Sequence, residues 1–407
     1  MTSYQNVLQF DLDQLSTIHI IKNDAEALEI AHTLAEQFKL NAVQRDAQRI
    51  LPFKEVAAFS QSGLWAITVP KEYGGAEVST LTVAKIIALI SGIDGSLGQI
   101  PQNHFYALEV LRNTASAAQK KRLYGEILKG ARLGNALAEF KTKSASIRHT
   151  HIQAKADGFS VNGEKFYCTG SLFAHRIPTL VKDQHEREFL AFIPRQSAGL
   201  TIHDDWSGFG QRTTGSGTVK LDQVHVDAED IIPFSEAFER PTIVGPFAQI
   251  MHAAIETGIA RAAFEETLVR IRQARPWIDS GVTAATQDPL SLYELGRMIA
   301  DVRATEVLLK QAAQSIDAAK IATTAENVAQ ASIDVAKVRA LSTDIALKTS
   351  SKLIELAGSR GSQRQDGLDR FWRNARTHTL HDASRWKYYF IGQYVLNGIL
   401  PPRRGTL

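Results

Sequence analysis

The chain contains almost no cysteine, with Cys168 alone among 407 residues. A single thiol forms neither a disulfide frame nor a thiolate metal cluster. No His/Asp pair is placed to activate it, so we expect Cys168 to be a small buried filler. The sequence also lacks the glycine-rich dinucleotide fingerprint, the P-loop and the HExxH motif. Nucleotide-dependent and zinc chemistries therefore have no motif here, and we predict no metal site.

A strong charge excess and long apolar runs are absent too. The formal net charge is +3, which gives no electrostatic reason to expect a nucleic acid or an acidic membrane as partner. No apolar run approaches the roughly 20 residues that a membrane helix needs. The N-terminus lacks the basic patch and apolar core of a secretory signal. With 44% hydrophobic and 22% charged residues, the sequence predicts a soluble cytoplasmic protein.

Three regions with different periodicity follow one another along the chain. After a short arm, apolar residues recur at helical spacing up to about residue 130. A β-rich region begins at Gly134, and from Gly245 to the end the helical period returns in long, Ala-rich segments. We therefore predict an α+β multidomain fold. Its parts are an N-terminal α-helical domain (1–132), a middle antiparallel β sandwich or barrel (133–240) and a C-terminal four-helix-type bundle (241–407).

The middle region consists of short β-rich stretches separated by turn residues. Two dipeptides, Asp157-Gly158 and Asn162-Gly163, are typical of hairpin turns, because type I′ turns need positive φ. Strands are expected at 134–140, 151–156, 159–168, 188–193, 199–204 and 215–221. In the last region, long helices are expected near 247–274, 290–320 and 324–357.

A segment near the C-terminus concentrates planar and titratable side chains. Between Asp369 and Asp382 the sequence reads DRFWRNARTHTLHD, with several arginines, one tryptophan and the pair His378 and His381. Surface helices are usually rich in Lys and Glu, whereas Arg, Trp and His together suit a site that stacks on planar groups or binds anions. The segment therefore predicts a functional site, and the alternative is a solvated basic helix.

Four segments, in this order, resemble the acyl-CoA dehydrogenase superfamily, and the resemblance extends from about Asp24 to Pro402. They are VPKEYGG (69–75), EKFYCTG (164–170), GFGQRTTGSGTVKLDQVHV (208–226) and RFWRNARTHTLHD (370–382). Within that superfamily, the chain resembles the sulfur-acquisition oxidoreductases related to dibenzothiophene-type monooxygenases. The segments that carry this closer resemblance are IPQNHFYALEVLRN, DDWSGFGQRTTGSGTV, RPWID and RTHTLHDASRWKYYFIG.

The resemblance implies a flavin-dependent oxidoreductase. Its branch implies a two-component monooxygenase that uses reduced FMN (FMNH2) from a separate flavin reductase, together with O2, on a small organosulfur compound in sulfur acquisition. Two alternatives stay open. One is an FAD-dependent acyl-CoA dehydrogenase that uses Asp382 as its base. The other is a non-catalytic interaction protein that kept the fold.

Matching positions in the superfamily imply which residues bind the flavin. Asn135, Thr169 and Trp206 match positions that line the flavin ring, although Trp206 as a core aromatic and Thr169 as a strand hydroxyl remain alternatives. Arg272, Arg275 and Arg360 are expected at the flavin phosphate; singly, each arginine also suits a surface ion pair. A guanidinium beside hydroxyl donors suits the terminal phosphate of FMN better than the pyrophosphate of FAD.

Three residues are candidates for the chemistry. His381 is expected to act as acid/base or to stabilise the oxygenated flavin, and His104 to lie near the ring unless it is a structural histidine. Asp382 falls where dehydrogenases of this fold carry a glutamate base. Its alternative role is to cap the last helix.

The Ala-rich segment 324–357 and the last helix, 386–400, carry more apolar surface than one bundle covers. The sequence therefore predicts a homotetramer with the flavin near a subunit boundary.

Overall fold

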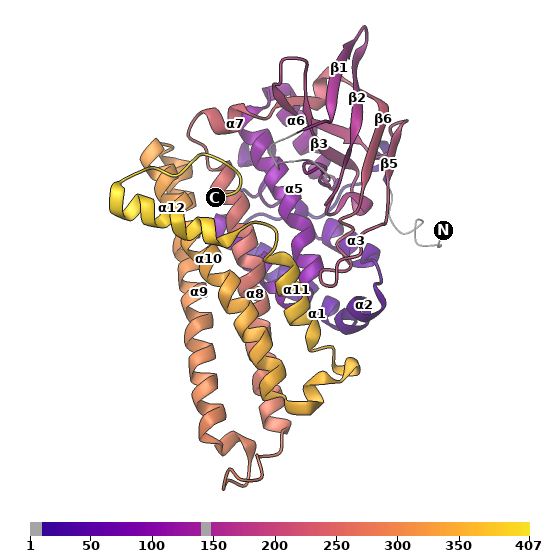
Figure 1. The fold of residues 1–407 in the computed structure, drawn as a ribbon. Coiled ribbons are helices and arrows are strands. Elements are labelled where there is room, and N and C mark those ends of the chain that lie inside the picture. The colour runs from indigo at the N-terminus through magenta and orange to yellow at the C-terminus, as the bar shows by residue number, and fades with distance from the viewer. Residues whose placement is uncertain (1–9, 140–147) are drawn as a thin grey trace.

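The computed structural model describes residues 10–139 and 148–407 (Figure 1). Helices precede and follow one β-sheet, and the long C-terminal helices run side by side away from it (Figure 1). The predicted order of helical region, β region and helix bundle is confirmed. Among the described residues, no helix has the length and apolarity required to cross a membrane.

The N-terminal helices begin where side chains satisfy their free amide groups. Asn23 accepts a hydrogen bond from the Glu26 amide, and Ser79 accepts one from the Thr82 amide. Such caps stabilise a helix by about 1 kcal/mol. These helices are α1 (Asp24–Lys39), α2 (Ala42–Gln48), α3 (Phe53–Gln61), α4 (Thr80–Ile93), α5 (Gly95–Thr114) and α6 (Ala117–Ile127).

The β region forms one seven-stranded sheet in the order β5-β6-β2-β1-β3-β4-β7. Neighbouring strands are antiparallel except for β1 and β3, which pair in parallel at His151 and Lys182. The strands are β1 (His151–Lys155), β2 (Gly158–Lys165), β3 (Arg176–Lys182), β4 (Glu188–Pro194), β5 (Leu200–Ile202), β6 (Val219–Val226) and β7 (Ile231–Pro233).

Only one of the two hairpin dipeptides lies at a turn. At Asp157-Gly158 a turn does join β1 and β2, but its two residues are Ala156 and Asp157, and Gly158 already pairs with Lys155 as the first residue of β2. The prediction for Asn162-Gly163 was wrong, because both residues lie inside β2 at a shift of register. Gly163 has φ +153°, and a Cβ there would lie 2.5 Å from Thr150 Oγ1. The glycine therefore permits close passage of a neighbouring segment rather than a turn.

Two strands were missed, and one expected strand is reduced. β3 is buried and central but contains Pro178, which disfavours a strand assignment because proline cannot donate to the ladder. β7 has only three residues. In the expected strand 134–140, Ala136 makes an isolated bridge to Thr179; residue 140 lies outside the described residues, as do residues 1–9 of the predicted arm.

The C-terminal region is a bundle whose long helices begin close to the predicted positions. Asp288 caps α9 and Thr324 caps α10 through their side chains. The helices are α7 (Glu236–Glu239), α8 (Val244–Gln273), α9 (Pro289–Ile321), α10 (Ala325–Leu356), α11 (Asp369–His378) and α12 (Ser384–Asn397), with 3-10 helices η8 (Gly358–Ser362) and η9 (Arg364–Asp366) before α11.

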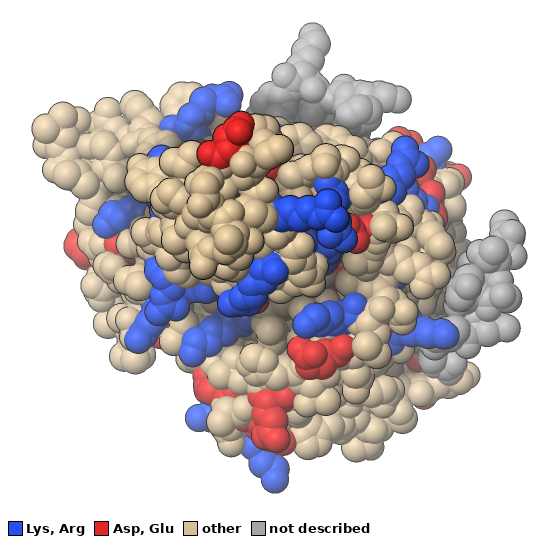
Figure 2. Space-filling model, turned by 90° about the horizontal axis from the view of Figure 1, so that it is seen from below, with Lys and Arg blue, Asp and Glu red and all other residues tan. Residues whose placement is uncertain are grey.

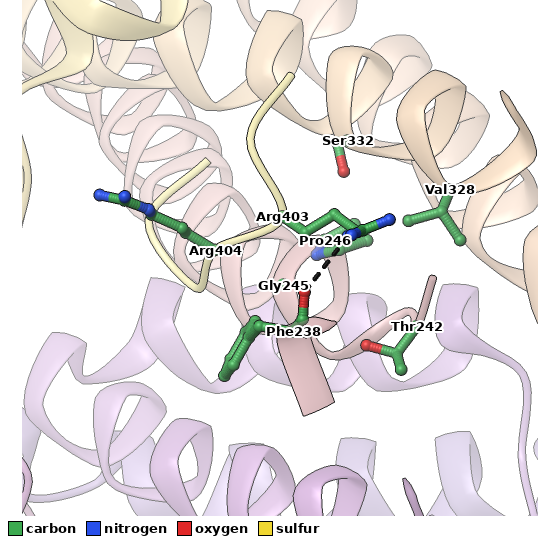
Figure 3. Close-up of a pocket in the computed structure, with 8 residues that line it drawn as sticks. All are labelled: Phe238, Thr242, Gly245, Pro246, Val328, Ser332, Arg403 and Arg404. Carbon is green, nitrogen blue, oxygen red and sulfur yellow. Dashed lines mark hydrogen bonds between the residues drawn. The ribbon is translucent and has the colours of Figure 1, made fainter. Parts of the chain in front are cut away.

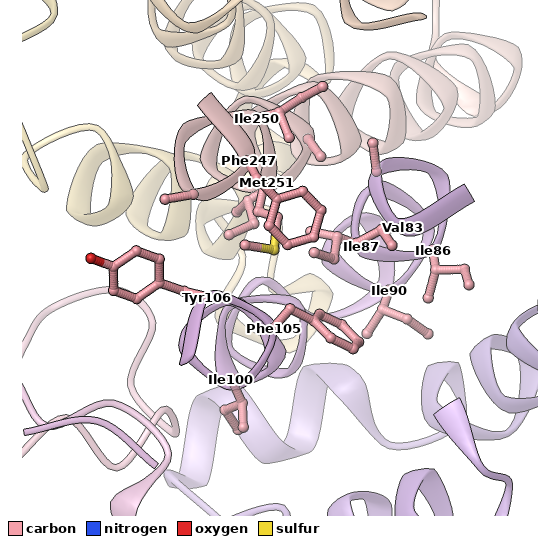
Figure 4. Packing of buried hydrophobic residues seen from close by; sticks show 14 of the residues in the cluster. Val83, Ile86, Ile87, Ile90, Ile100, Phe105, Tyr106, Phe247, Ile250 and Met251 are labelled. Atoms are coloured by element: carbon pink, nitrogen blue, oxygen red, sulfur yellow. The ribbon is translucent and has the colours of Figure 1, made fainter. Parts of the chain in front are cut away.

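A continuous core joins the N-terminal helices to the bundle. Ile87 of α4, Phe105 of α5 and Met251 of α8 point toward one another in it (Figure 4). Helices α4 and α8 can approach closely because Gly258 has no side chain. A Cβ at this position would lie 2.0 Å from the Ala88 carbonyl oxygen. The packing fixes α8 firmly, and α8 carries the polar residues described next.

Candidate active site

Helix α8 carries three polar residues on one buried face. Gln249, His252 and Glu256 are each at most 2% exposed. Their spacing of three and four residues places them on the same side of the helix. Burial of such groups is costly unless they are hydrogen-bonded. Each therefore needs partners from the helices that pack against this face.

Glu256 is surrounded by donors. Its Oε1 pairs with Arg339 of α10 and accepts a hydrogen bond from His378 Nδ1 at 2.9 Å. Its Oε2 accepts from the hydroxyls of Ser342 at 2.8 Å and Thr343 at 3.0 Å. Burial alone would raise the pKa of Glu256, but Arg339 and His378 outweigh it and hold the pKa below its ordinary value. Glu256 is therefore a carboxylate at neutral pH.

Three imidazoles lead from Glu256 toward the surface. His378 Nε2 lies 3.0 Å from His252 Nδ1. The ring of His252 packs on that of His381, with centroids 4.1 Å apart. His252 and His378 are buried, whereas His381 is exposed. No hydrogen bond joins the His381 ring nitrogens to another described residue, so this imidazole is free to meet a ligand.

All three histidines have lowered pKa values. For His252 and His378 the main cause is burial, which disfavours the charged form. For His381 the main cause is the protein packed around the ring, although part of the residue is exposed. For His252, the other two imidazoles and nearby cations add to the effect. For His378, Glu256 opposes it, and for His381, Asp382 does so. All three imidazoles are therefore uncharged at neutral pH.

Asp382 is held between two cations. Its carboxylate lies 3.5 Å from Arg339 Nη2 and 3.4 Å from Lys387 Nζ. Burial would raise the pKa of Asp382, but these cations hold it below its ordinary value. The alternative role as a helix cap is wrong, because Ala383 occupies the N-cap position of α12 and no side chain caps it.

Lys387 also anchors the C-terminal tail. It donates to Gln249 Oε1 at 3.1 Å and to the Thr406 carbonyl at 2.9 Å. A cavity of about 10 Å³ lies beside this tail, lined partly by Gly245, Arg403 and Arg404 (Figure 3). That volume is close to the minimum for one water molecule, so it is no site for a larger ligand.

His104 lies apart from this cluster, with both ring nitrogens engaged. Its Nε2 donates to the Trp65 carbonyl at 2.7 Å, and its Nδ1 accepts from the Leu133 amide at 3.1 Å. The side chain is fully buried, which lowers the pKa of His104 to about 3. His104 therefore has no ring nitrogen free for a ligand in this structure, and its role stays a prediction.

The three residues expected at the flavin ring come together around Tyr167. The Tyr167 carbonyl accepts from Asn135 Nδ2 at 3.2 Å and from the Thr169 amide at 2.9 Å. The Trp206 ring lies 6.1 Å from the Tyr167 ring. Thr169 shares a hydrogen bond of 2.7 Å with Ser216. Among the described residues, Asn135 Oδ1 is buried without a hydrogen-bond partner, so a ligand group would satisfy it.

The three arginines lie elsewhere, at the far end of the bundle. Arg272 is in the last turn of α8, Arg275 follows it, and Arg360 is in η8. All are exposed, and none forms an ion pair within the described parts of the chain. At helical rise, Arg272 lies about 30 Å from His252 along α8. The view from below shows Lys and Arg side chains spread across the middle of this end (Figure 2).

Comparison with known proteins identifies the family. Residues 26–131 match the family model of the acyl-CoA dehydrogenase N-terminal domain, and residues 250–386 match that of the acyl-CoA dehydrogenase C-terminal domain. The chain belongs to the acyl-CoA dehydrogenase family.

Its relatives include monooxygenases. The chain is 31% identical over 395 residues to a dibenzothiophene monooxygenase of Rhodococcus qingshengii, covering 93% of this chain and 95% of that protein. It is 28% identical over 389 residues to a probable FMNH2-dependent monooxygenase, SfnC, of Pseudomonas putida, covering 92% and 96%. The crystal structure of FMN-bound TdsC from Paenibacillus sp. A11-2 superposes with a TM-score of 0.89 at 31% identity, covering 94% of this chain and all of that one.

The sequence did not single out His252, Glu256, Arg339 or Lys387. One signal for the first two was present: polar residues at helical spacing in an otherwise apolar helix. Arg339 of α10 and Lys387 of α12 could not be recognised in the same way. Ordinary surface helices also contain Arg and Lys, so neither residue stands out in the sequence.

Proposed function

We propose that the protein is a two-component flavin-dependent monooxygenase that uses FMNH2 from a separate reductase, and O2, to oxidise a small organosulfur compound. The observation that carries this is the pair His381 and Asp382. His381 has free ring nitrogens on an exposed face, whereas Asp382 is paired with Arg339 and Lys387. The names of the relatives, a dibenzothiophene monooxygenase and an FMNH2-dependent monooxygenase, support the same conclusion.

Reduced FMN fits the residues that this chain presents. Asn135 Oδ1 is a buried acceptor without a partner, which suits an N–H of the flavin ring. Trp206 offers an aromatic surface beside it. When bound, the reduced flavin supplies the two electrons that activate O2. Bound FMN in the structural relative TdsC agrees with this cofactor, and FAD remains the alternative.

The residues of the chain contribute protons and positioning. His381 is neutral at neutral pH, so one ring nitrogen accepts a proton while the other donates one. Thr169, fixed by Ser216, holds a hydroxyl at the ring-lining cluster.

The same geometry disfavours acyl-CoA dehydrogenation. A general base works best when its pKa lies near the operating pH. Asp382 has a lowered pKa and is paired with two cations, Arg339 and Lys387, which makes it a weak base. An acyl-CoA dehydrogenase would bleach its bound flavin on addition of acyl-CoA without oxygen. We expect no bleaching.

We also propose that the flavin phosphate is bound across a subunit boundary. Arg272, Arg275 and Arg360 form no ion pair among the described residues, and they lie at the end of the bundle that points away from the sheet (Figure 1). Exposed apolar side chains on α12, including Trp386 and Leu396, offer a surface for assembly. A homotetramer brings both elements together, and light scattering that reports a monomer at micromolar concentration would contradict it.

The test supplies FMNH2 through a reductase, in air, with a panel of sulfides, sulfones and sulfonates, and follows product by mass spectrometry. Omission of the reductase is the control. Oxygenated product that depends on the reductase supports the proposal. Anaerobic bleaching by acyl-CoA instead supports the dehydrogenase, and failure to bind any flavin supports a non-catalytic interaction protein. We place the protein in the cytoplasm, where a flavin reductase has access to reduced nicotinamide cofactor.

A further inference from the structure

The polar face of α8 contains a hydrogen-bond chain with only one permitted direction. Glu256 is a carboxylate, so it accepts from His378 and the proton between them must be on His378 Nδ1. A neutral His378 then has a lone pair on Nε2, which accepts from His252. The proton between the two rings is therefore on His252 Nδ1, across a distance of 3.0 Å.

The direction of this chain leaves one nitrogen of His252 unprotonated. A neutral imidazole carries a single ring proton, so His252 Nε2 is a bare acceptor. That nitrogen makes no hydrogen bond to another described residue. The ring of His252 packs directly on His381, with a centroid separation of 4.1 Å. Glu256 thus reaches the exposed imidazole through two intermediates.

The charges around the three imidazoles balance without a proton on any of them. Glu256 of α8 and Asp382 are negative; Arg339 of α10 and Lys387 of α12 are positive. A proton added to His252 or His378 therefore creates a net positive charge in a buried site, where charge is costly. These four groups are among the neighbours that shift the pKa values of the three histidines.

We propose that Glu256, His378 and His252 are positioning residues for His381. The hydrogen-bond chain fixes His252 as its neutral Nδ1–H tautomer, and the fixed ring of His252 holds the His381 ring in place and keeps it unprotonated. The catalytic meaning of this arrangement rests on the proposed monooxygenase function. The tautomer and the state of His381 do not, because both exist without flavin.

The first test examines the wild-type protein without flavin. The chain has 12 histidines, so labelling with ¹³C,¹⁵N-histidine gives a countable set of ring signals, and those of His252 and His381 are assigned by loss in the His252→Gln and His381→Ala variants. We expect Nδ1–H on His252 at neutral pH and a His381 that titrates below about 6.5, the ordinary value. A protonated His252, or one with Nε2–H, would overturn the proposal.

A matched pair of substitutions at His378 tests the direction of the chain. Glutamine in His378→Gln carries a donor for Glu256 and an acceptor for His252, so it preserves the direction. Phenylalanine in His378→Phe keeps a ring of similar size and removes both groups. We expect the glutamine variant to keep the His252 tautomer and the His381 pKa. In the phenylalanine variant the tautomer is released, the His252 ring no longer holds His381 in place, and the pKa of His381 rises toward the ordinary value.

The pair also separates positioning from packing in the active enzyme. We expect product formed per O2 consumed to fall roughly 10- to 100-fold in His378→Phe, as when a reacting group is misplaced, and to stay within a few-fold of wild type in His378→Gln. A purely structural His378 would make both variants lose stability without this difference in coupling. The exposed His185→Gln variant is the control for labelling and handling.

The outcomes distinguish this inference from the proposed function. If wild type oxygenates no organosulfur compound but shows the expected tautomer and Gln/Phe contrast, the proposed function fails and the hydrogen-bond chain stands. If wild type is an active monooxygenase and both His378 variants leave the His252 tautomer and His381 pKa unchanged, the positioning role is wrong. Should His378→Phe fail to fold, the wild-type tautomer alone decides.

Discussion

His104 on α5 and His381 after α11 are the same chemical group in opposite surroundings. Backbone groups engage both nitrogens of His104, which is fully buried. His381 is exposed and leaves both nitrogens free among the described residues, with another imidazole packed against its face. Both have lowered pKa values. A perturbed pKa therefore does not by itself identify a catalytic histidine; free nitrogens in reach of a ligand do.

The largest expected effect is that of His381→Ala. Removal of a positioned acid/base usually costs about 10²–10⁴-fold in rate, and we expect oxygenation of substrate to fall by that amount. Binding of reduced flavin should stay within a few-fold of wild type, and O2 consumption should continue with release of hydrogen peroxide. Product and peroxide are measured in the same reaction. If the variant couples O2 consumption to product formation as well as the wild type does, His381 has only a structural role.

The next effect is on stability, at the other histidine. His104→Phe leaves the Trp65 carbonyl and the Leu133 amide buried without partners. Each unsatisfied group costs about 1–3 kcal/mol, so we expect the free energy of unfolding to fall by roughly 2–6 kcal/mol in denaturant titration. Product formed per folded enzyme should change little. A large loss of coupling in a folded His104→Phe protein would return His104 to the catalytic candidates.

The pH dependence of stability sharpens the comparison. His104 has a pKa of about 3 in the folded protein and about 6.5 when unfolded. As pH falls below 6.5, His104 binds a proton in the unfolded chain but stays unprotonated in the folded protein, so the free energy of unfolding decreases. Between pH 7 and pH 5 the contribution is about 2 kcal/mol. His104→Gln should remove that share of the pH slope in urea unfolding, whereas an unchanged slope would contradict the assigned burial.

The smallest effect is expected for Asp382→Asn. In the monooxygenase, Asp382 only offsets Arg339 and Lys387, so we expect a loss of at most about ten-fold, the effect of roughly 1.4 kcal/mol. A dehydrogenase that used Asp382 as base would lose nearly all activity. Steady-state turnover of this variant beside His381→Ala therefore ranks the two neighbouring residues directly.

Periodicity predicted the architecture well, because the apolar patterns of the long helices are local. Helices α9 and α10 begin after Asp288 and Thr324, whose side chains cap their N-termini. β3 was missed because Pro178 argues against a strand, and only tertiary burial overrides it. Asn162-Gly163 was misassigned because the close approach of Thr150 that requires the glycine is non-local.

The site was predicted in part. The resemblance to known flavoproteins led to His381, and to Asn135, Thr169 and Trp206, which the fold does gather around Tyr167. Their roles stay predictions. The buried partners of His381 were out of reach of sequence reasoning, because Glu256, Arg339 and His252 meet only through the packing of α8, α10 and α11.

The most direct test of the account follows the oxygen atoms. The protein is supplied with FMNH2 under ¹⁸O2, with an organosulfur substrate that the panel identifies, and the product is analysed by mass spectrometry. The account predicts that each catalytic cycle adds one ¹⁸O atom to the product. With His381→Ala it predicts almost no labelled product. Product that carries oxygen only from water, or none at all alongside anaerobic bleaching of bound flavin by acyl-CoA, would contradict it.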